Sequence, residues 1–215
     1  MPRMEQAVVF LGGTNGAGKS YLTEQLAERD DYAVTKQKRE LTAVGEERGI
    51  PYEEIPKRYD ELIAPAAERA VEEFAAADAR VLLFDCHYAF QKEKAVTMNL
   101  EGEIPDIDEA YQQAVDDRVI SRFLDRFPTG FVFLSVDPAV AHRRMKRRAK
   151  NVEDEEVTLE EVKERQEAER IHYDGITEKF DVDADRHTVI DNSREGDAAG
   201  VELERFVDSK LRSRR

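Results

Sequence analysis

The sequence is poor in cysteine and has no long apolar run, and each absence excludes a class of protein. Cys86 is the single cysteine among 215 residues, so a scaffold held by internal disulfides is excluded. No segment approaches the roughly 18 consecutive apolar residues that a membrane-spanning helix needs. Residues 1–6 contain charge and a proline where a secretory signal has its apolar core. We therefore expect a cytoplasmic protein without a membrane partner.

Positive charge is also scarce in this chain. Aspartate and glutamate number 47 against 33 lysines and arginines, which leaves a formal net charge of −14. A surface of this sign repels nucleic-acid phosphates, so nucleic-acid binding is disfavoured. An acidic excess is also typical of halophilic proteins, in which salt screens the repulsion between like charges. We therefore expect the protein to become more stable as the salt concentration rises.

The chain does contain short apolar runs that alternate with segments of helical periodicity. The runs predict strands at 7–12, 32–35, 81–84, 131–136 and 188–190. The periodic segments predict helices at 18–29, 59–77, 108–127, 158–180 and 198–211, with another helix beginning at Pro138. Segments 89–105 and 151–157 are expected to be irregular, and Pro65 predicts a kink or a break in its helix.

Strands separated by helices predict an α/β fold in which helices cover both faces of a parallel sheet. No linker, repeat or low-complexity tract interrupts the chain, so we expect one domain over 1–215. Parallel sheets of this kind bind their ligands at the carboxyl ends of the strands. Candidate functional residues are therefore sought at those ends.

A glycine-rich segment directly follows the first predicted strand and fits the pattern G-x-x-x-x-G-K-[ST]. Its glycines permit positive φ angles, so that successive backbone N–H groups can point at phosphate above the N-terminus of the next helix. Lys19 is predicted to reach the β- and γ-phosphates of ATP, and Ser20 to bind Mg²⁺. The predicted ATP-binding residues are Gly13, Thr14, Asn15, Gly16, Ala17, Gly18, Lys19 and Ser20.

Asp85 and an arginine-rich helix are expected beside this loop. Asp85 closes the run 81–84, where a protein with such a loop holds a second carboxylate toward Mg²⁺. His87 is expected either to meet a phosphate or an acceptor base, or to be a structural hydrogen-bonding residue. Arginine forks bind the oxygens of a transferred phosphoryl group, and segment 142–150 concentrates them. The predicted catalytic residues are Lys19, Asp85, Arg143 and Arg147, with Arg144, Arg148, Arg165 and Arg170 as further candidates.

Missing residues argue against several nucleotide-binding classes. A GTPase carries N/T-K-x-D, but the matching segment, Thr35 to Lys38, ends in lysine. AAA and ABC ATPases have two adjacent acids after the strand, whereas Cys86 follows Asp85 here. The sequence therefore favours a small-molecule kinase. An ATP-binding switch or accessory ATPase, whose arginine helix docks a partner protein, is the alternative.

The loop, the sequence Asp85-Cys86-His87 and the step from Val136-Asp137-Pro138 into the basic helix resemble the P-loop nucleoside monophosphate kinases, above all the archaeal-type adenylate kinases. The resemblance implies a P-loop NTPase three-layer sandwich with a five-stranded parallel sheet. It also implies a short lid at about 143–158 and an acceptor region at about 36–65, in which Lys36, Lys38, Arg39 and Arg58 would hold a monophosphate.

The activity that the resemblance implies is transfer of the γ-phosphoryl group of ATP, with Mg²⁺, to a nucleotide or small-molecule acceptor. The segment after His87 contains no recognisable motif for an acceptor base, so the acceptor is left open. Residues 191–193 follow the last predicted strand, where they either lie near the adenine or form a turn. A monomer and an oligomer both agree with the sequence.

Overall fold

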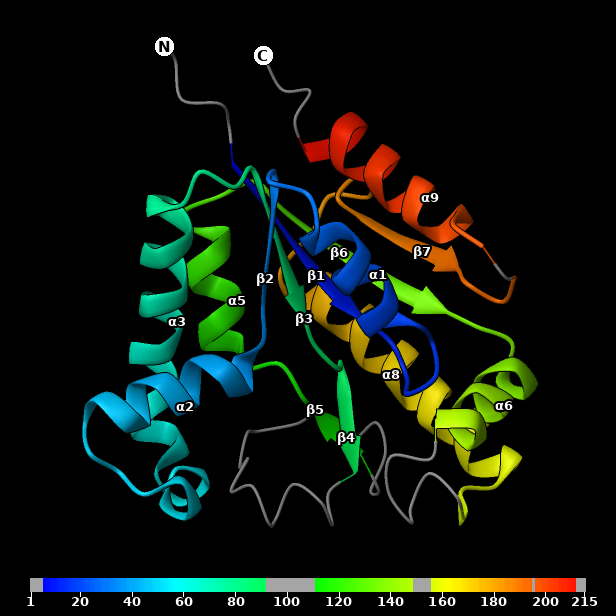
Figure 1. Cartoon of the computed structure of the whole chain (residues 1–215), viewed down its shortest axis with the longest axis horizontal. Helices are drawn as coiled ribbons and strands as arrows, with labels where there is room; N and C mark the ends of the chain where they lie inside the picture. Colours follow the sequence, from blue (N-terminus) through cyan, green and yellow to red (C-terminus); the bar gives the residue numbers. More distant parts are fainter. Residues whose placement is uncertain (1–5, 92–110, 149–155, 195, 212–215) are drawn as a thin grey trace.

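The computed structural model describes residues 6–91, 111–148, 156–194 and 196–211 (Figure 1). The strands are β1 (Ala7–Gly12), β2 (Tyr32–Thr35), β3 (Val81–Asp85), β4 (Ala89–Gln91), β5 (Tyr111–Gln113), β6 (Thr129–Ser135) and β7 (His187–Asp191). The α-helices are α1 (Lys19–Ala27), α2 (Gln37–Glu47), α3 (Tyr59–Ala76), α5 (Asp117–Leu124), α6 (Pro138–Arg148), α8 (Leu159–Lys179) and α9 (Ala198–Phe206). Short helical turns are η1 (Tyr52–Glu54), η2 (Pro56–Arg58) and η3 (Val207–Leu211).

Five of these strands form one parallel sheet in the order β2-β3-β1-β6-β7. This order confirms the predicted α/β sandwich with a five-stranded parallel sheet. The register pairs Leu11 of β1 with Asp85 of β3, so the loop after β1 and the carboxylate at the end of β3 lie at the same edge. A separate antiparallel pair, β4 and β5, follows that edge.

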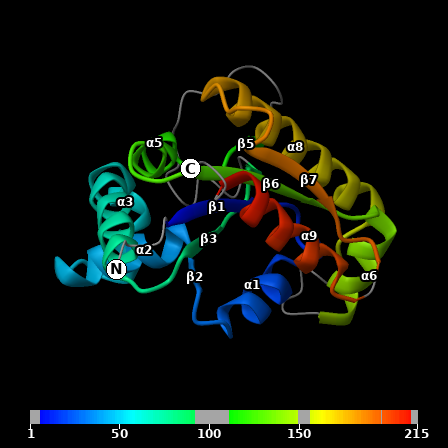
Figure 2. The ribbon, with the colours of Figure 1, turned by 90° about the horizontal axis from the view of Figure 1, so that it is seen from above.

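The central strands are buried on both faces, and alternate residues enter two separate cores. Val8 and Phe10 pack with α3, α5 and part of α8, whereas Val9 and Leu11 pack with α1 and α9. Figure 2 shows α5 and α8 on one side of the sheet and α1 and α9 on the other. This burial explains why the strands read as continuous apolar runs rather than as an alternating pattern.

Three expectations about the elements need correction. The helix predicted over 108–127 is wrong in its first part, because residues 111–113 form β5 and the helix begins only at Asp117. Helix α2 was not predicted, since glycine and charged residues dilute its apolar stripe of Leu41 and Val44. Pro65 was expected to kink or break its helix, and the break does not occur, because α3 continues through it.

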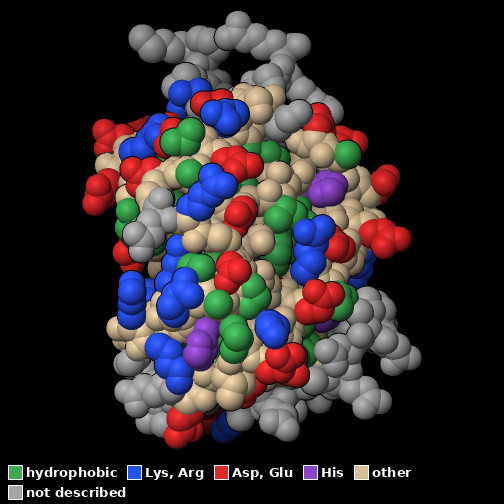
Figure 3. Space-filling model, turned by 90° about the vertical axis from the view of Figure 1, so that its right-hand side faces the viewer, with side chains coloured by type: hydrophobic (Ala, Val, Ile, Leu, Met, Phe, Trp, Pro, Cys, Tyr) green, Lys and Arg blue, Asp and Glu red, His purple; other side chains and the backbone are tan. Residues whose placement is uncertain are grey.

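Other parts of the prediction lie outside the described residues or concern the surface. Residues 149–155 of the predicted lid and 92–110 of the segment after His87 are outside them. Among the helices that the structure describes, none is long and apolar enough to cross a membrane. On the face in Figure 3, acidic and basic side chains are interspersed rather than gathered into one large face of a single sign.

Candidate active site

The loop between β1 and α1 has the backbone conformation that its glycines predict. Gly13, Gly16 and Gly18 all have positive φ, at 141°, 80° and 97°. A Cβ atom at Gly13 would lie 2.5 Å from the carbonyl oxygen of Leu134, so the loop also passes too close to β6 for a side chain. Only glycine satisfies both demands at this position. The backbone is thus shaped to direct N–H groups toward an anion at the start of α1.

Lys19 lies inside this loop rather than in solvent. Its ammonium group donates to the carbonyl oxygens of Gly13 and, at 3.5 Å, Thr14, and the side chain is buried. Burial lowers the pKa of Lys19, while the carboxylates of Glu169 and Asp85 oppose that shift. The loop therefore holds a partly compensated cation where the terminal phosphates of a nucleotide would enter.

Asp85 faces the same place from the end of β3. It is buried, and its Oδ2 accepts a 2.6 Å ion pair from Lys36, which directly follows β2. Asp85 and Ser20 line one cavity and offer the oxygen donors that Mg²⁺ prefers. No group of three or more acidic, histidine or cysteine side chains within the described ranges could hold a metal by itself. The pair therefore fits an ion that takes its remaining ligands from phosphate and water.

His87 is held by a residue that the sequence analysis missed. Its Nδ1 lies 2.5 Å from Oε1 of Glu169, an almost fully buried carboxylate on α8. The other oxygen of Glu169 accepts from the backbone N–H groups of Tyr88, at 2.6 Å, and Ala89, at 3.4 Å. Burial disfavours the charged form of Glu169, but His87, Lys19 and the Tyr88 N–H outweigh it and hold the pKa of the carboxyl below its usual value. Glu169 thus anchors the chain that follows Asp85.

The arginine helix α6 meets the site through other arginines than those first expected. Arg144 donates to the carbonyl oxygens of Gly16, at 3.4 Å, and Arg194, at 3.5 Å. Arg148 lines the cavity, whereas Arg143 and Arg147 are exposed and do not line it. The helix starts as predicted, since the carboxylate of Asp137 accepts from the N–H groups of Ala139 and Val140.

Asn192 connects the loop after β7 to the phosphate loop. Its Nδ2 donates to the carbonyl oxygen of Ala17 at 2.7 Å, and it would lie 2.4 Å from a Cβ atom at Gly18. This contact brings the segment 191–193 beside the phosphate loop, and its expected position near the adenine stays a prediction. Asp191 and Ser193 form a local turn, in which the Ser193 N–H donates to Asp191 at 2.9 Å.

Several of these groups line one end of a cavity of about 340 Å³, and a second wall lines its other end. The phosphate loop, Asp85 and His87 form one end, and α2, η1, η2 and the turn after β5 form the other. Lys36 and Lys38 line it, as the predicted acceptor region requires, but Arg39 and Arg58 do not. Arg39 donates to the Val34 carbonyl oxygen at 3.2 Å. Arg58 is paired with Glu61 at 2.7 Å.

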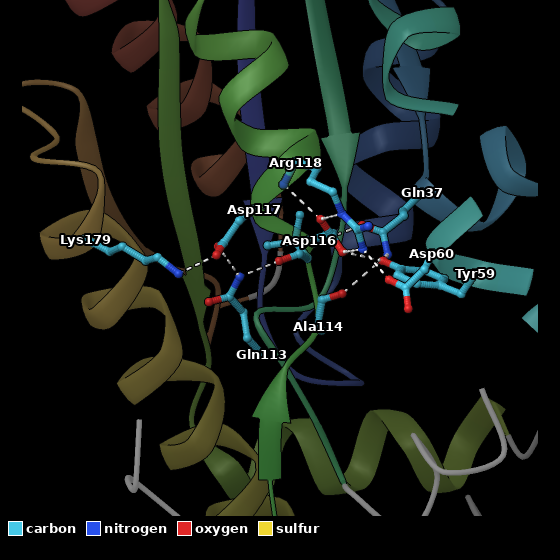
Figure 4. Close-up of polar contacts among 10 residues, drawn as sticks. Gln37, Tyr59, Asp60, Gln113, Ala114, Asp116, Asp117, Arg118 and Lys179 are labelled. Atoms are coloured by element: carbon cyan, nitrogen blue, oxygen red, sulfur yellow. Dashed lines mark hydrogen bonds and ion pairs between the residues drawn. The ribbon is translucent and has the colours of Figure 1, made fainter. Parts of the chain in front are cut away.

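A hydrogen-bonded cluster supports this second wall, as Figure 4 shows. Gln37 donates to the hydroxyl of Tyr59 at 2.9 Å, and that hydroxyl donates to Asp116 at 3.2 Å. Arg118 binds the same carboxylate through Nε at 2.9 Å and Nη2 at 2.8 Å. Burial opposes the ionised form of Asp116, but the bonds from Arg118 and Tyr59 prevail and lower its pKa. The cluster ties α2, α3 and α5 together behind the cavity.

The candidate residues that the sequence analysis missed are Glu169, Gln37, Tyr52 and Tyr59. Glu169 lies 82 positions from His87, so no local spacing relates the two residues. For Gln37, the signal was the helix that begins there, which the sequence analysis did not identify. Tyr59 was placed correctly on a helix, but the apolar stripe of α3 gave no reason to separate it from ordinary core residues.

Solved structures of similar fold are known. The crystal structure of TT1252 from Thermus thermophilus is 15% identical, with a TM-score of 0.51, and the match covers 95% of this chain and 97% of that one. The tunicamycin resistance protein of Deinococcus radiodurans is 14% identical, with a TM-score of 0.53 and 95% coverage of both chains. A gluconokinase from Sinorhizobium meliloti 1021 is 17% identical, with a TM-score of 0.43, covering 98% of this chain and 93% of that one. No curated protein matches the chain significantly.

A family model described as an AAA domain matches residues 9–172. The matched part contains the phosphate loop, Asp85, the arginine helix α6 and Glu169. Cys86 stands where AAA and ABC ATPases carry a second acid, and the family model matches the chain without that acid. The chain belongs to the AAA_18 family, and its loop and sheet are those of a P-loop NTPase.

Proposed function

We propose that this protein is a phosphotransferase that uses ATP and Mg²⁺ to phosphorylate a nucleotide or another small molecule. The observation that carries the proposal is the cavity, which continues from the phosphate loop to a wall built by α2, η1 and η2. A protein that only binds ATP needs the first part, whereas a kinase needs a second compartment open to the same phosphates. Adenylate kinase-like specificity is the form of this proposal that the sequence resemblance favours.

The residues would act by position and charge. Lys19 and the loop N–H groups would bind the phosphates, and Arg144 or Arg148 would approach them from α6. Ser20 and Asp85 would hold Mg²⁺, which supplies charge neutralisation to phosphate oxygens when bound. Glu169 would keep His87 and the chain after Asp85 in place. Such transfer relies on orientation and exclusion of water and needs no covalent intermediate.

The switch alternative makes a different use of the same loop. It assigns α6 to a partner protein, and the exposed Arg143 and Arg147 are compatible with that role. It assigns no function to the part of the cavity that α2, η1, η2 and the turn after β5 form, so we favour the kinase.

ADP release measured with a panel of candidate acceptors tests the proposal. We expect a stimulated rate with at least one acceptor, and a loss of at least 100-fold in Lys19→Ala. Lys163→Ala is the control, because Lys163 lies exposed on α8 and pairs with Glu160. Slow ATP hydrolysis that no acceptor stimulates, or full turnover by Lys19→Ala, would contradict the proposal.

A further inference from the structure

The end of the cavity away from the phosphate loop has mostly apolar walls. Four of its side chains, Leu41, Ile55, Ala114 and Val115, are buried residues of the protein interior. Pro56 and Tyr52 add further apolar surface, and Tyr52 is 57% exposed. Desolvating such walls favours a ligand that brings apolar surface of its own.

Two polar side chains of this wall, Gln37 and Tyr59, already have partners within the protein. Both polar atoms of Gln37 are engaged, since Nε2 donates to Tyr59 and Oε1 accepts the Asp116 N–H at 3.1 Å. The hydroxyl of Tyr59 donates to Asp116, and burial with that contact raises its pKa, so it stays neutral. Gln37 and Tyr59 therefore present ring and methylene surface to the cavity, whereas Thr42 and Tyr52 also line it with hydroxyl groups.

The arginines around this end are paired with carboxylates of the protein rather than directed at a phosphate. A monophosphate is best held by arginine forks, but Arg58 is paired with Glu61 and Arg118 with Asp116 and Asp60. Lys36 is paired with Asp85, and Lys38 lies over the ring of Tyr52 at 5.5 Å. Arg148 also lines the cavity, but it belongs to α6, whose Arg144 contacts the phosphate loop. We therefore assign Arg148 to the phosphates of ATP rather than to the acceptor.

We infer that the acceptor is an uncharged molecule with a largely apolar body that offers a hydroxyl group, rather than a nucleoside monophosphate. This inference rests on the proposed kinase activity and names its substrate class. The hydroxyl oxygen bonds to the γ-phosphorus of ATP, the bond from that phosphorus to the β-bridging oxygen breaks, and ADP leaves. The hydroxyl proton passes to solvent, so each turnover releases one proton above the second pKa of the new phosphomonoester.

Proton release separates the two acceptor classes. A hydroxyl acceptor gives a phosphomonoester whose second pKa is about 6, so one proton appears per ADP at a pH of about 8. A monophosphate acceptor is already ionised and gives a phosphoanhydride with no net proton. Hydrolysis of ATP also releases a proton but forms inorganic phosphate, which is assayed in parallel.

The experiment incubates the full chain with Mg²⁺, γ-labelled ATP and a protein-free cell extract, and separately with adenosine, AMP, uridine and UMP. We expect a labelled product that resists hot dilute acid, as a phosphomonoester does, and one proton per ADP without inorganic phosphate. An acid-labile product without proton release overturns this inference and leaves the kinase proposal standing. Label found only in inorganic phosphate contradicts the kinase proposal, and this inference with it.

Matched variants test the wall itself with the acceptor found in that extract. Tyr52→Ala should raise the KM for the acceptor by about 10-fold and leave the KM for ATP unchanged, because an aromatic contact is lost. Tyr21→Ala is the control, since Tyr21 is 51% exposed and does not line the cavity. Lys38→Met should change the acceptor KM by less than about 3-fold, whereas loss of a charge-assisted bond to a phosphate would raise it by more than 10-fold. The larger change overturns the inference.

Discussion

At the scale of single residues, Glu169 connects parts of the candidate site that the sequence analysis did not relate to one another. It joins α8 to the chain after β3 through His87 Nδ1 and the Tyr88 N–H. It also acts on Lys19, whose pKa its charge raises against the effect of burial. An ionised carboxylate at this depth is stable only because those partners are present.

We predict that Glu169→Gln lowers the free energy of unfolding by about 2 kcal/mol at neutral pH, because charged hydrogen bonds are lost at a buried position. The folded pKa of Glu169 is lower than its usual value of 4.5. Its stabilising effect is therefore complete above about pH 4.5 and disappears as the pH falls through the folded pKa. Urea denaturation should thus show the parent and the variant converging below that pH.

The control for this prediction is Glu178→Gln, which removes an exposed carboxylate from the same helix. It should change the free energy of unfolding by less than about 0.5 kcal/mol at either pH. If Glu169→Gln destabilised the protein equally at neutral and acidic pH, ionisation of Glu169 would not be the source of the effect.

How far single residues could be predicted depended on the distance between partners along the chain. The phosphate loop is a local motif, and its positive φ angles at Gly16 and Gly18 confirm the sequence prediction. The pairing of His87 with Glu169 arises only from packing of α8 beside the end of β3, which local spacing does not encode. Arg143 and Arg147 could not be separated from Arg144 and Arg148 by sequence, because helical spacing alone does not say which ridge faces the loop.

At the scale of elements, α3 shows how tertiary packing can override a local signal. Pro65 lacks the N–H group that would bond the preceding turn, yet the helix continues because both of its ends pack against the core. We predict that Pro65→Ala raises the free energy of unfolding by about 1 kcal/mol, since proline in a helix interior is about 3 kcal/mol less favourable than alanine and relaxation recovers part of that. Urea denaturation measures the change.

Pro51 provides the matched control for this prediction. It precedes η1 with φ of −57°, the value that the proline ring favours. Pro51→Ala should therefore lower stability by about 0.5 kcal/mol, because the unfolded chain gains freedom. Stability that falls in both variants would show that Pro65 causes no strain in α3.

The type of each buried element was predictable where burial made its pattern simple. The parallel strands carry continuous apolar runs, and the capping pair Thr158 and Glu161 marks the start of α8, where the Thr158 N–H donates to Glu161 at 2.6 Å. Residues 111–124 contain a short strand followed by a helix. The sequence analysis extended the helical periodicity of the second part over the first and so predicted a single helix. Short strands such as β5 carry too few residues to establish a period of two.

At the scale of the whole molecule, the alternation of strands and helices predicted a parallel sheet covered by helices on both faces, but it did not predict the strand order β2-β3-β1-β6-β7. The second wall of the cavity, which α2, η1, η2 and the turn after β5 form, did not follow from this alternation either. The elements α2, η1 and η2 are close along the chain, but the turn after β5 is distant from them and meets them only in the folded protein. The acceptor class is therefore a property of the tertiary structure.

The net charge of −14 leads to the prediction for the molecule as a whole. Added KCl weakens attraction in exposed ion pairs such as Arg170–Asp174, but pairs of this kind contribute at most about 1 kcal/mol each. Screening of the excess negative charge should therefore dominate, so that the free energy of unfolding rises with KCl and flattens near about 1 M, where the Debye length is about 3 Å. Replacing three exposed glutamates, Glu28, Glu178 and Glu202, by lysine should reduce the rise. A parent protein equally stable in dilute buffer, or a triple variant with the same salt response, would show that charge repulsion does not limit its stability.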